Sequence, residues 1–194
     1  MNYLGHLVLS PSSARIRTAN LVADWIPHAD LSEFSEDIRH GFQRHRAIDS
    51  YTDAHPAVRE MNRLLRPTVK KYSPVASDLI IDFLLAHHWY RYHNCTYEAF
   101  CSDMYVQLKA ASTSFPPLVS QRLEKLVRYQ WLNNKRDSLS WQHTLKNMDK
   151  RARFPSNFMA VQSLLLDEFA LFRELFENLY EEARIRFPSA YHLN

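Results

Sequence analysis

The amino-acid sequence predicts an all-α fold, a single-domain helical bundle that spans residues 1–194. Only 2 of the 194 residues are glycine, which disfavours tight turns with positive φ, glycine-rich phosphate loops and β-hairpins. Residues with high helix propensity are abundant instead. Hydrophobic residues make up 46% of the chain, and a chain of this length is long enough for one buried core but short for two domains.

The amino-terminal part of the chain divides into helices at its turn signals. An apolar segment at 2–9 is expected as a short helix or an extended segment, and the Ser-Pro-Ser-Ser turn after it supplies an N-cap for a helix at 14–25. A loop or short helix at 27–35 leads into a helix at 36–53. That helix ends before His55-Pro56, because proline disfavours the helical conformation of the preceding residue.

Apolar periodicity and proline breakers place the remaining helices. They are expected at 57–65, 73–92, 97–112, 118–132, 137–148 and 158–186. Ser73-Pro74 opens a helix rich in Leu and Ile, and Ser114-Phe115-Pro116-Pro117 is the clearest break between helices. Segment 158–186 carries a broad apolar stripe at helical spacing and is predicted to be one long amphipathic helix.

Charge and cysteine content narrow the class of protein. The net charge of +3 and the pI of about 8.9 favour an acidic partner or an anionic substrate, yet are far from histone-like, so no nucleic-acid partner is expected. Cys95 and Cys101 form no disulfide framework and indicate reduced thiols in a cytoplasmic protein. The apolar amino-terminal segment has no basic region before it, so we expect neither a signal peptide nor a membrane anchor.

One face of the predicted helix at 36–53 carries an imidazole and two carboxylates. His45, Asp49 and Asp53 are spaced four residues apart, which stacks their side chains one turn apart on a helix. Burying an unpaired carboxylate is unfavourable by several kcal/mol, so such a face requires water, a cation or a metal. A solvated face, or one in which Arg44 and Arg46 pair with the acids, is the alternative interpretation.

Other polar residues stand in unusual places. Asp24 lies near the carboxyl end of the predicted helix at 14–25, where the helix dipole disfavours an acid, and this indicates a bound cation or a paired arginine. Asn20 lies on the same face, one turn earlier. His6 interrupts an apolar segment, as a core histidine or as a ligand. Asp82 lies among Ile, Phe and Leu, one turn after Asp78, and a buried acid is normally paired or metal-bound.

A local basic cluster follows the acidic face. It consists of Arg63, Arg66, Lys70 and Lys71. It is either a solvated surface or a docking surface for an anion or an acidic protein.

Several segments together resemble one known family. They are MNYLGHL at the amino terminus, NLVADW, HRAIDSYTD, the helix of Asp78 and Asp82 followed by HHW, and QWLNNKRD at 130–137. Over essentially the whole chain, the sequence resembles the acyl carrier protein phosphodiesterases. This family is regarded as a divergent branch of the HD-type metal-dependent phosphohydrolases, which implies an all-helical, HD-domain-like fold.

The resemblance implies a reaction in lipid metabolism and fatty acid biosynthesis. The family hydrolyses the phosphodiester that joins 4′-phosphopantetheine to a serine of holo-acyl carrier protein, and it requires a divalent metal, typically Mn²⁺ or Mg²⁺. The acidic carrier protein would then be the partner. The present sequence has no contiguous His-Asp dipeptide, so the ligand set of the wider HD class cannot be transferred directly.

The residues and the implied chemistry together give a hypothesis for the site. The expected metal ligands are Asp24, His45, Asp49 and Asp82. His6 and His88 are expected as further ligands or as proton donors to the leaving serine, and Asp53 and Asp78 as groups that orient the ligands or hold a second metal. Arg44, Arg46 or the cluster of Arg63, Arg66, Lys70 and Lys71 would hold the phosphate or the carrier protein.

Two other functions remain open at this point. The first is an HD-like phosphohydrolase that acts on a nucleotide or another small phosphoester. The second is a helical interaction protein whose basic surface binds an acidic partner and whose acids are paired with arginines. Such an adaptor would purify without stoichiometric metal.

Overall fold

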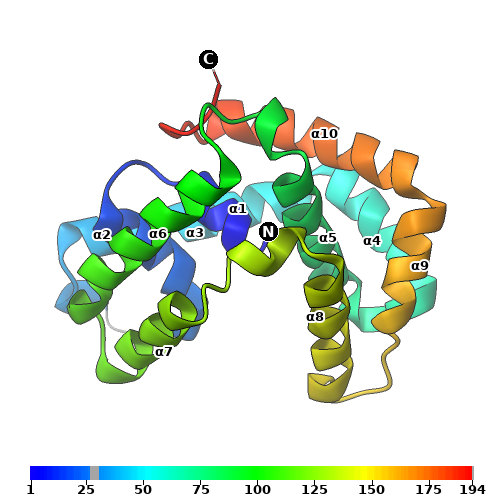
Figure 1. Ribbon diagram of the computed structural model, residues 1–194, viewed down its shortest axis with the longest axis horizontal. Coiled ribbons are helices and arrows are strands. Elements are labelled where there is room, and N and C mark those ends of the chain that lie inside the picture. The colour runs from blue at the N-terminus through cyan, green and yellow to red at the C-terminus, as the bar shows by residue number, and fades with distance from the viewer. Residues whose placement is uncertain (27–30, 194) are drawn as a thin grey trace.

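The computed structural model describes residues 1–26 and 31–193, and over these residues the chain is all helical, as predicted (Figure 1). The α-helices are α1 (Tyr3–Val8), α2 (Ala14–Val22), α3 (Glu36–Ala54), α4 (Pro56–Val69), α5 (Ser73–His87), α6 (Tyr97–Ala111), α7 (Pro117–Arg128), α8 (Ser138–Arg151), α9 (Met159–Asp167) and α10 (Phe169–Arg186). Short 3-10 helices are η1 (Ala23–Trp25), η2 (Leu31–Glu33), η3 (Lys70–Tyr72), η4 (Trp89–Arg91), η5 (Ser112–Ser114) and η6 (Asn133–Arg136). Within the described residues, β-structure is limited to one isolated bridge between His93 and His192.

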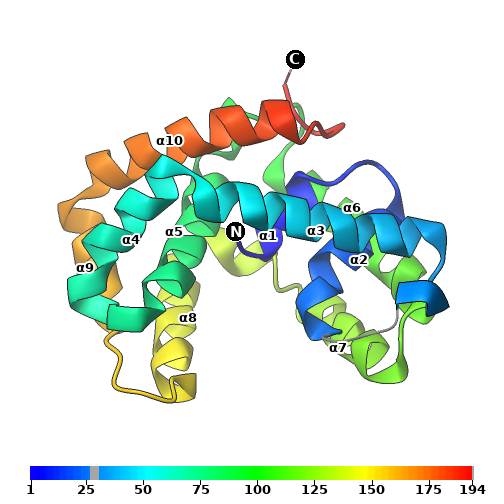
Figure 2. The same cartoon turned by 180° about the vertical axis from the view of Figure 1, so that it is seen from behind.

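The helices pack around one hydrophobic core, with α1 at its centre. In Figures 1 and 2, helices α2, α6 and α7 form one side of the molecule, and α4, α5, α8 and α9 form the other. Helix α3 runs across both sides, and α10 lies across the top. Helix α1 contacts both α2 and α5, so its six residues lie between the two groups. Among the described residues, no helix is long and apolar enough to cross a membrane.

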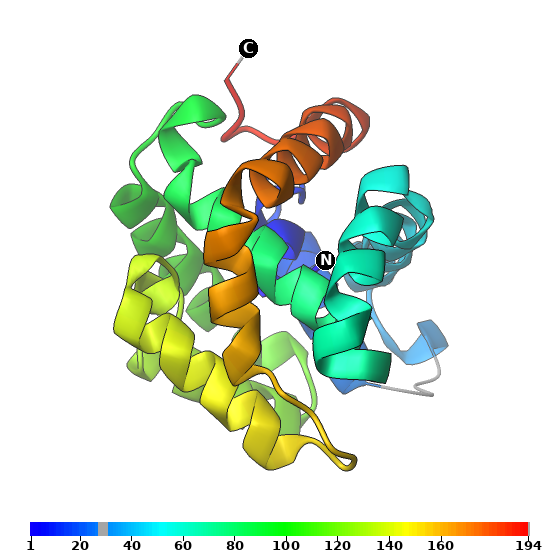
Figure 3. The same cartoon turned by 90° about the vertical axis from the view of Figure 1, so that its right-hand side faces the viewer.

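The segment at 158–186 differs from the prediction, because it forms two helices rather than one. The chain leaves helical geometry at Glu168, where φ is −110° and ψ is 26°. Figure 3 shows the change of direction between α9 and α10. Helix α9 packs against α8 and α4, whereas α10 packs against α4 and α5, and one straight helix could not reach both sets of neighbours.

Other predicted boundaries also shift, since the helices predicted at 57–65 and 73–92 span Pro56–Val69 and Ser73–His87. The predicted helix at 14–25 ends in the 3-10 turn η1, which carries Asp24. The loop at 27–35 lies partly outside the described residues, and its described part contains η2. The predicted helix at 118–132 stops at Arg128, because Gln130 has a φ of 45° and a left-handed residue cannot continue a right-handed helix.

Helices α2 and α3 approach each other closely at Gly41. A Cβ atom on this residue would overlap the Ala19 side chain and the backbone oxygen of Ile16. Glycine at this position therefore sets how closely the two helices pack. The close approach brings Asn20 of α2 beside His45 of α3, one turn after the glycine.

Candidate metal centre

The candidate centre is built from residues of α1, α3 and η1. His6 comes from α1, whereas His45 and Asp49 come from one face of α3. One ligand atom from each of these three residues lies within 4.8 Å of the other two. The imidazole rings of His6 and His45 are stacked, with their centroids 4.2 Å apart and an interplanar angle of 19°.

Both imidazoles direct Nε2 at the carboxylate of Asp49. His6 Nε2 lies 3.1 Å from Oδ1, and His45 Nε2 lies 3.0 Å from Oδ2. Asp24 in η1 adds a second carboxylate, with its Oδ1 at 3.1 Å from His45 Nε2. The two histidines are buried, whereas the side chain of Asp49 is 34% exposed and that of Asp24 is 76% exposed. The group therefore has a buried imidazole floor and a carboxylate side that is open to solvent.

Asn20 fixes the orientation of both rings. Its Nδ2 donates to the carbonyl oxygen of His6 (2.9 Å) and to Ser10 Oγ (2.6 Å), which leaves Oδ1 to accept from His6 Nδ1 at 2.9 Å. The carbonyl oxygen of Asn20 accepts from His45 Nδ1 at 2.8 Å. Because each Nδ1 carries a proton, each Nε2 has its lone pair available for a metal when the ring is neutral.

Without a metal, the same group is held together by charge. Burial disfavours the imidazolium form of His45, but hydrogen bonds to Asp24 and Asp49 outweigh it and raise the pKa of His45 to about 9. Burial likewise disfavours the Asp49 carboxylate, but hydrogen bonds from His45 and His6 hold its pKa well below the usual range. The hydrogen bond from His45 also lowers the pKa of Asp24. Both acids are therefore carboxylates at neutral pH, as metal ligands must be.

A cavity of about 290 Å³ opens beside these residues. It is lined by Asp24, His45, Arg46 and Asp49 together with apolar Ala23, Ile26, Leu31 and Phe42. Arg46 is exposed at this cavity, which places a cation beside the carboxylates.

Asp82, one of the expected ligands, lies outside the three-residue group and contacts the backbone of α1. It is fully buried, and its two oxygens accept hydrogen bonds from the backbone N–H groups of Leu4 (3.0 Å) and Gly5 (3.1 Å). These are N–H groups of the first turn of α1, which have no partner within the helix. Asp82 therefore anchors the short helix that carries His6.

Asp78 and Asp53 lie at the edges of the group. Asp78 forms an ion pair with the α-ammonium group of Met1 at 3.0 Å, and the same nitrogen lies 3.7 Å from Asp49 Oδ1. Asp53 is exposed, one turn beyond Asp49 on α3. Neither belongs to the set of three ligand atoms that the structure brings together.

His88 lies against α10, away from the elements that carry the other two histidines. Its ring faces Phe169 and Phe176, with both centroids 6.4 Å from its own. Burial lowers the pKa of His88, and its Nε2 is buried without a hydrogen-bond partner. The structure does not bring His88 to the centre, so we do not retain it there as a ligand or proton donor.

The candidate arginines and lysines have separate roles. Arg44 donates to the carbonyl oxygens of Leu9 (2.8 Å) and Pro188 (3.4 Å) and ties the carboxyl-terminal segment to the α1 region. The remaining candidates lie on α4 and η3. Arg63 pairs with Glu60 at 2.7 Å, Arg66 and Lys70 are exposed, and Lys71 lies over the ring of Phe154.

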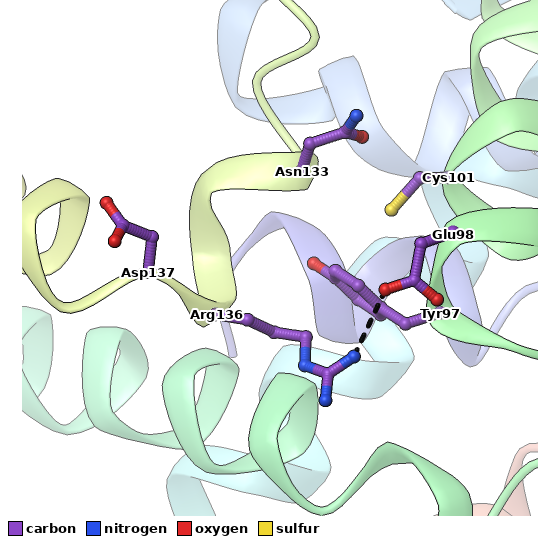
Figure 4. A pocket seen from close by; sticks show the side chains of 6 residues that line it. All are labelled: Tyr97, Glu98, Cys101, Asn133, Arg136 and Asp137. Atoms are coloured by element: carbon purple, nitrogen blue, oxygen red, sulfur yellow. Dashed lines mark hydrogen bonds and ion pairs between the residues drawn. The ribbon is translucent and has the colours of Figure 1, made fainter.

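A second cavity, of about 390 Å³, lies between α6 and η6 (Figure 4). Its lining includes an ion pair between Arg136 and Glu98 at 3.2 Å, and the side chains of Tyr97, Cys101, Asn133 and Asp137. Burial raises the pKa of Cys101 to about 12, so this thiol is not a nucleophile at neutral pH. Part of the QWLNNKRD segment lines this second cavity, whereas the candidate metal centre is built from α1, η1 and α3.

Sequence reasoning missed the role of Asn20 as the residue that orients both histidines. Its position one turn before Asp24 was visible, but its contacts with His6 and Ser10 depend on how α1 packs against α2. The signal in the sequence that could have indicated this role is the position of the Asn20 amide on the same helix face as the Asp24 carboxylate.

Comparison with known proteins places this sequence in a family. The family model described as acyl carrier protein phosphodiesterase matches residues 1–183. The chain belongs to this family. Curated relatives named acyl carrier protein phosphodiesterase, from Salmonella paratyphi A (strain ATCC 9150 / SARB42), Salmonella dublin and Salmonella newport (strain SL254), are each 28% identical over 152 residues, which cover 78% of this chain and 79% of the relative.

Family membership confirms the resemblance that the sequence predicted. No solved structure matches the chain significantly, so the more distant likeness to HD-type folds stays a prediction. As a member of the acyl carrier protein phosphodiesterase family, the chain belongs to a family of hydrolases.

Proposed function

We propose that this protein hydrolyses the phosphodiester between 4′-phosphopantetheine and the serine of holo-acyl carrier protein, releasing 4′-phosphopantetheine and apo-acyl carrier protein. Membership of the family supports the substrate, and the His6, His45 and Asp49 group supports a metal-dependent reaction. The proposed ligands are the Nε2 atoms of His6 and His45 and the carboxylate of Asp49, with Asp24 as a fourth ligand or as a base.

The observation that carries the proposal is the presentation of two Nε2 atoms to one carboxylate. Hard divalent cations bind donors at about 2.1 Å in octahedral sites, which separates neighbouring donors by about 3.0 Å. The separations of 3.1 and 3.0 Å between the imidazole nitrogens and Asp49 match that spacing. Two imidazoles with carboxylates suit Mn²⁺ better than Mg²⁺, which prefers oxygen donors.

The residues around the group fit the hydrolysis of a phosphodiester. A bound divalent cation would act as a Lewis acid on the phosphoryl group and would lower the pKa of water. Asp24 is an exposed carboxylate at the cavity, where it would accept a proton from the attacking water. Arg46 would hold the phosphate oxygens at the open side of the cavity. Asn20 would keep both imidazoles in their ligating orientation.

Intact-mass spectrometry of the carrier protein tests this function directly. Holo-acyl carrier protein is incubated with the protein and Mn²⁺, and a parallel sample contains a chelator. We expect a loss of mass equal to phosphopantetheine only where metal is available. The proposal fails if no divalent metal supports this loss in a sample that is folded and binds the metal.

The two alternative functions, a small-phosphoester hydrolase and an adaptor, are tested by two further measurements. A panel of nucleotides and small phosphoesters is assayed beside the carrier protein, and turnover of one of these alone would point to a different phosphohydrolase. The metal content of the purified protein addresses the adaptor function, because an adaptor would hold no stoichiometric Mn²⁺ or Mg²⁺.

A further inference from the structure

One face of α7 carries a stripe of large exposed side chains. The stripe consists of Leu118, Arg122, Lys125 and Tyr129. Their spacing of four, three and four residues places them in a line along one side of the helix. Tyr129 continues the line beyond the helix end, because its N–H still donates to the carbonyl oxygen of Lys125 at 3.0 Å. Leu118 is 80% exposed and Tyr129 is 69% exposed.

The stripe is separate from the face with which α7 joins the core. That face carries the buried residues Val119 and Leu123 and packs against α6. Glu124, an acid of α7, lies on another side of the helix from the stripe. The stripe therefore presents two positive charges between two apolar side chains.

The α7 stripe is joined to the candidate metal centre by direct contacts. The guanidinium carbon of Arg122 lies 4.1 Å from the ring centroid of Trp25, the residue after Asp24. Trp25 Nε1 donates to the hydroxyl oxygen of Tyr3 at 3.3 Å, and the two rings meet edge to face. Tyr3 precedes His6 by three residues on α1. An occupant of the stripe would therefore lie next to Trp25 and to η1, the 3-10 helix that carries Asp24.

We propose that the α7 stripe is the docking surface for an acidic amphipathic helix of the carrier protein, an inference that rests on the proposed function. The scissile phosphodiester is attached directly to a serine on the carrier, so the carrier surface must touch the protein next to the metal centre. Acidic side chains would pair with Arg122 and Lys125, and apolar side chains of the same helix would pack on Leu118 and Tyr129.

The position of α7 favours it over the basic cluster on α4 and η3. Figures 1 and 2 show α4 and α7 on opposite sides of α1. In the α4 cluster, the Arg63 guanidinium is already paired with the carboxylate of Glu60. The α7 stripe instead combines exposed cations, exposed apolar residues and contact with Trp25 at the centre.

The test compares charge reversals on different helices. The double substitution Arg122→Glu and Lys125→Glu removes the positive charge of the stripe, and Leu118→Ala with Tyr129→Ala removes its apolar ends. The matched control is Lys146→Glu with Lys150→Glu, two exposed residues one turn apart on α8. Circular dichroism and thermal unfolding confirm that each variant is folded.

For the α7 charge reversal, we expect the KM for holo-acyl carrier protein to rise about tenfold or more, with kcat changed far less. The apolar variant should raise KM by a smaller factor, and the α8 control should leave KM within about twofold of the wild type. Binding of apo-acyl carrier protein in the presence of a chelator gives a second readout that does not depend on turnover. This binding should weaken most in the α7 charge reversal, less in the apolar variant and least in the α8 control.

The outcomes separate the docking surface from the proposed function. If the wild type releases phosphopantetheine but the α7 reversal leaves KM and binding unchanged, the docking proposal is overturned and the function stands. The same holds if Arg63→Glu with Arg66→Glu raises KM instead. If the wild type binds the carrier through α7 without releasing phosphopantetheine, the function is overturned and the docking surface stands. If the wild type neither binds the carrier nor releases phosphopantetheine, both proposals are overturned.

Discussion

His6 and His45 come from different helices, yet their rings are stacked with centroids 4.2 Å apart and both direct Nε2 at Asp49. Two imidazolium ions at this separation would repel each other, so the arrangement suits a shared cation or carboxylate better than two independent charges. Asp49 supplies the shared carboxylate, and both Nδ1 atoms are held by Asn20. These contacts make the group a preorganised donor set.

Replacement of Asp49 by asparagine should strongly weaken metal binding while the fold is kept. The amide matches the carboxylate in shape but removes the negative charge that both imidazoles share. We expect the affinity for Mn²⁺ to fall by at least about 100-fold, a larger loss than is usual for residues that only orient a ligand. Electron paramagnetic resonance of free Mn²⁺ measures the affinity, and circular dichroism measures helicity.

The comparison variant is Asp53→Asn, because this acid is exposed one turn farther along the same helix. Its effect on Mn²⁺ affinity should be much smaller. An equal loss in both variants would return Asp53 to the centre and would argue for a larger acidic site.

Replacement of Asn20 by alanine should weaken metal binding without removing any proposed ligand. The substitution removes the acceptor for His6 Nδ1 and the donor to the His6 carbonyl oxygen, so the ring of His6 is held less firmly in its ligating orientation. We expect a loss of about 10- to 100-fold in Mn²⁺ affinity. Titration calorimetry of the variant and the wild type measures it.

Asn20→Asp separates the two hydrogen bonds, since it keeps an acceptor for Nδ1 but removes the donor to the carbonyl oxygen and to Ser10. An intermediate affinity is expected. Wild-type affinity in Asn20→Ala would show that the packing of α1 alone orients His6.

The sequence predicted those features of the site that lie within one helix. The spacing of His45 and Asp49 is a local property of α3, and it placed both side chains on one face. The contribution of His6 depends on the position of α1, which is set by a hydrogen bond between Leu4 and Asp82, 78 positions apart in the chain. The apolar surroundings of Asp82 correctly indicated a buried acid that needs a partner. They could not show that the partner is the backbone of α1.

The fold was predictable for the same local reasons, and it departs from the prediction where tertiary packing decides. The serine cap and the proline breakers gave helix starts close to those observed. No proline or glycine marks Glu168, so the break between α9 and α10 has no local signal. It follows from the need of both helices to cover different parts of the core.

The affinity for Mn²⁺ should rise with pH, because a proton and the metal compete for His45 Nε2. The pKa of His45 is raised to about 9 in the metal-free protein, so metal binding between pH 6.5 and 9 must displace a proton. One displaced proton gives an increase of about tenfold in affinity per pH unit. Mn²⁺ titrations at pH 6.5, 7.5 and 8.5 measure the slope, and an affinity that does not change with pH would contradict the assignment of His45 as a ligand.

The same shift has the opposite consequence for the metal-free fold. A raised histidine pKa stabilises the folded state below the unfolded pKa of about 6.5, and this contribution is lost as the pH rises through about 9. In chelator, thermal stability should therefore fall as the pH is raised from 6.5 to 9. Mn²⁺ should reduce that fall.

Replacement of Asp82 by alanine should lower the free energy of unfolding of the protein, and not only its activity. It leaves the N–H groups of Leu4 and Gly5 buried without these acceptors, which reduces the free energy of unfolding by about 2–4 kcal/mol. Asp82→Asn keeps one acceptor oxygen and should lose less. Urea unfolding of the metal-free proteins measures both, and full stability in Asp82→Ala would mean that α1 is anchored by its apolar contacts.

Replacement of Gly41 by alanine should separate α2 from α3 and disturb the centre at a distance. The new methyl group would overlap the Ala19 side chain and the Ile16 backbone oxygen, and overpacking of this kind lowers the free energy of unfolding by about 1–3 kcal/mol. Because Asn20 follows Ala19, the Mn²⁺ affinity should fall as well. The double variant Gly41→Ala with Ala19→Gly relieves the side-chain overlap but keeps the backbone one, so it should recover part of both losses. If Gly41→Ala loses stability but keeps wild-type Mn²⁺ affinity, the spacing of α2 and α3 does not control the position of Asn20.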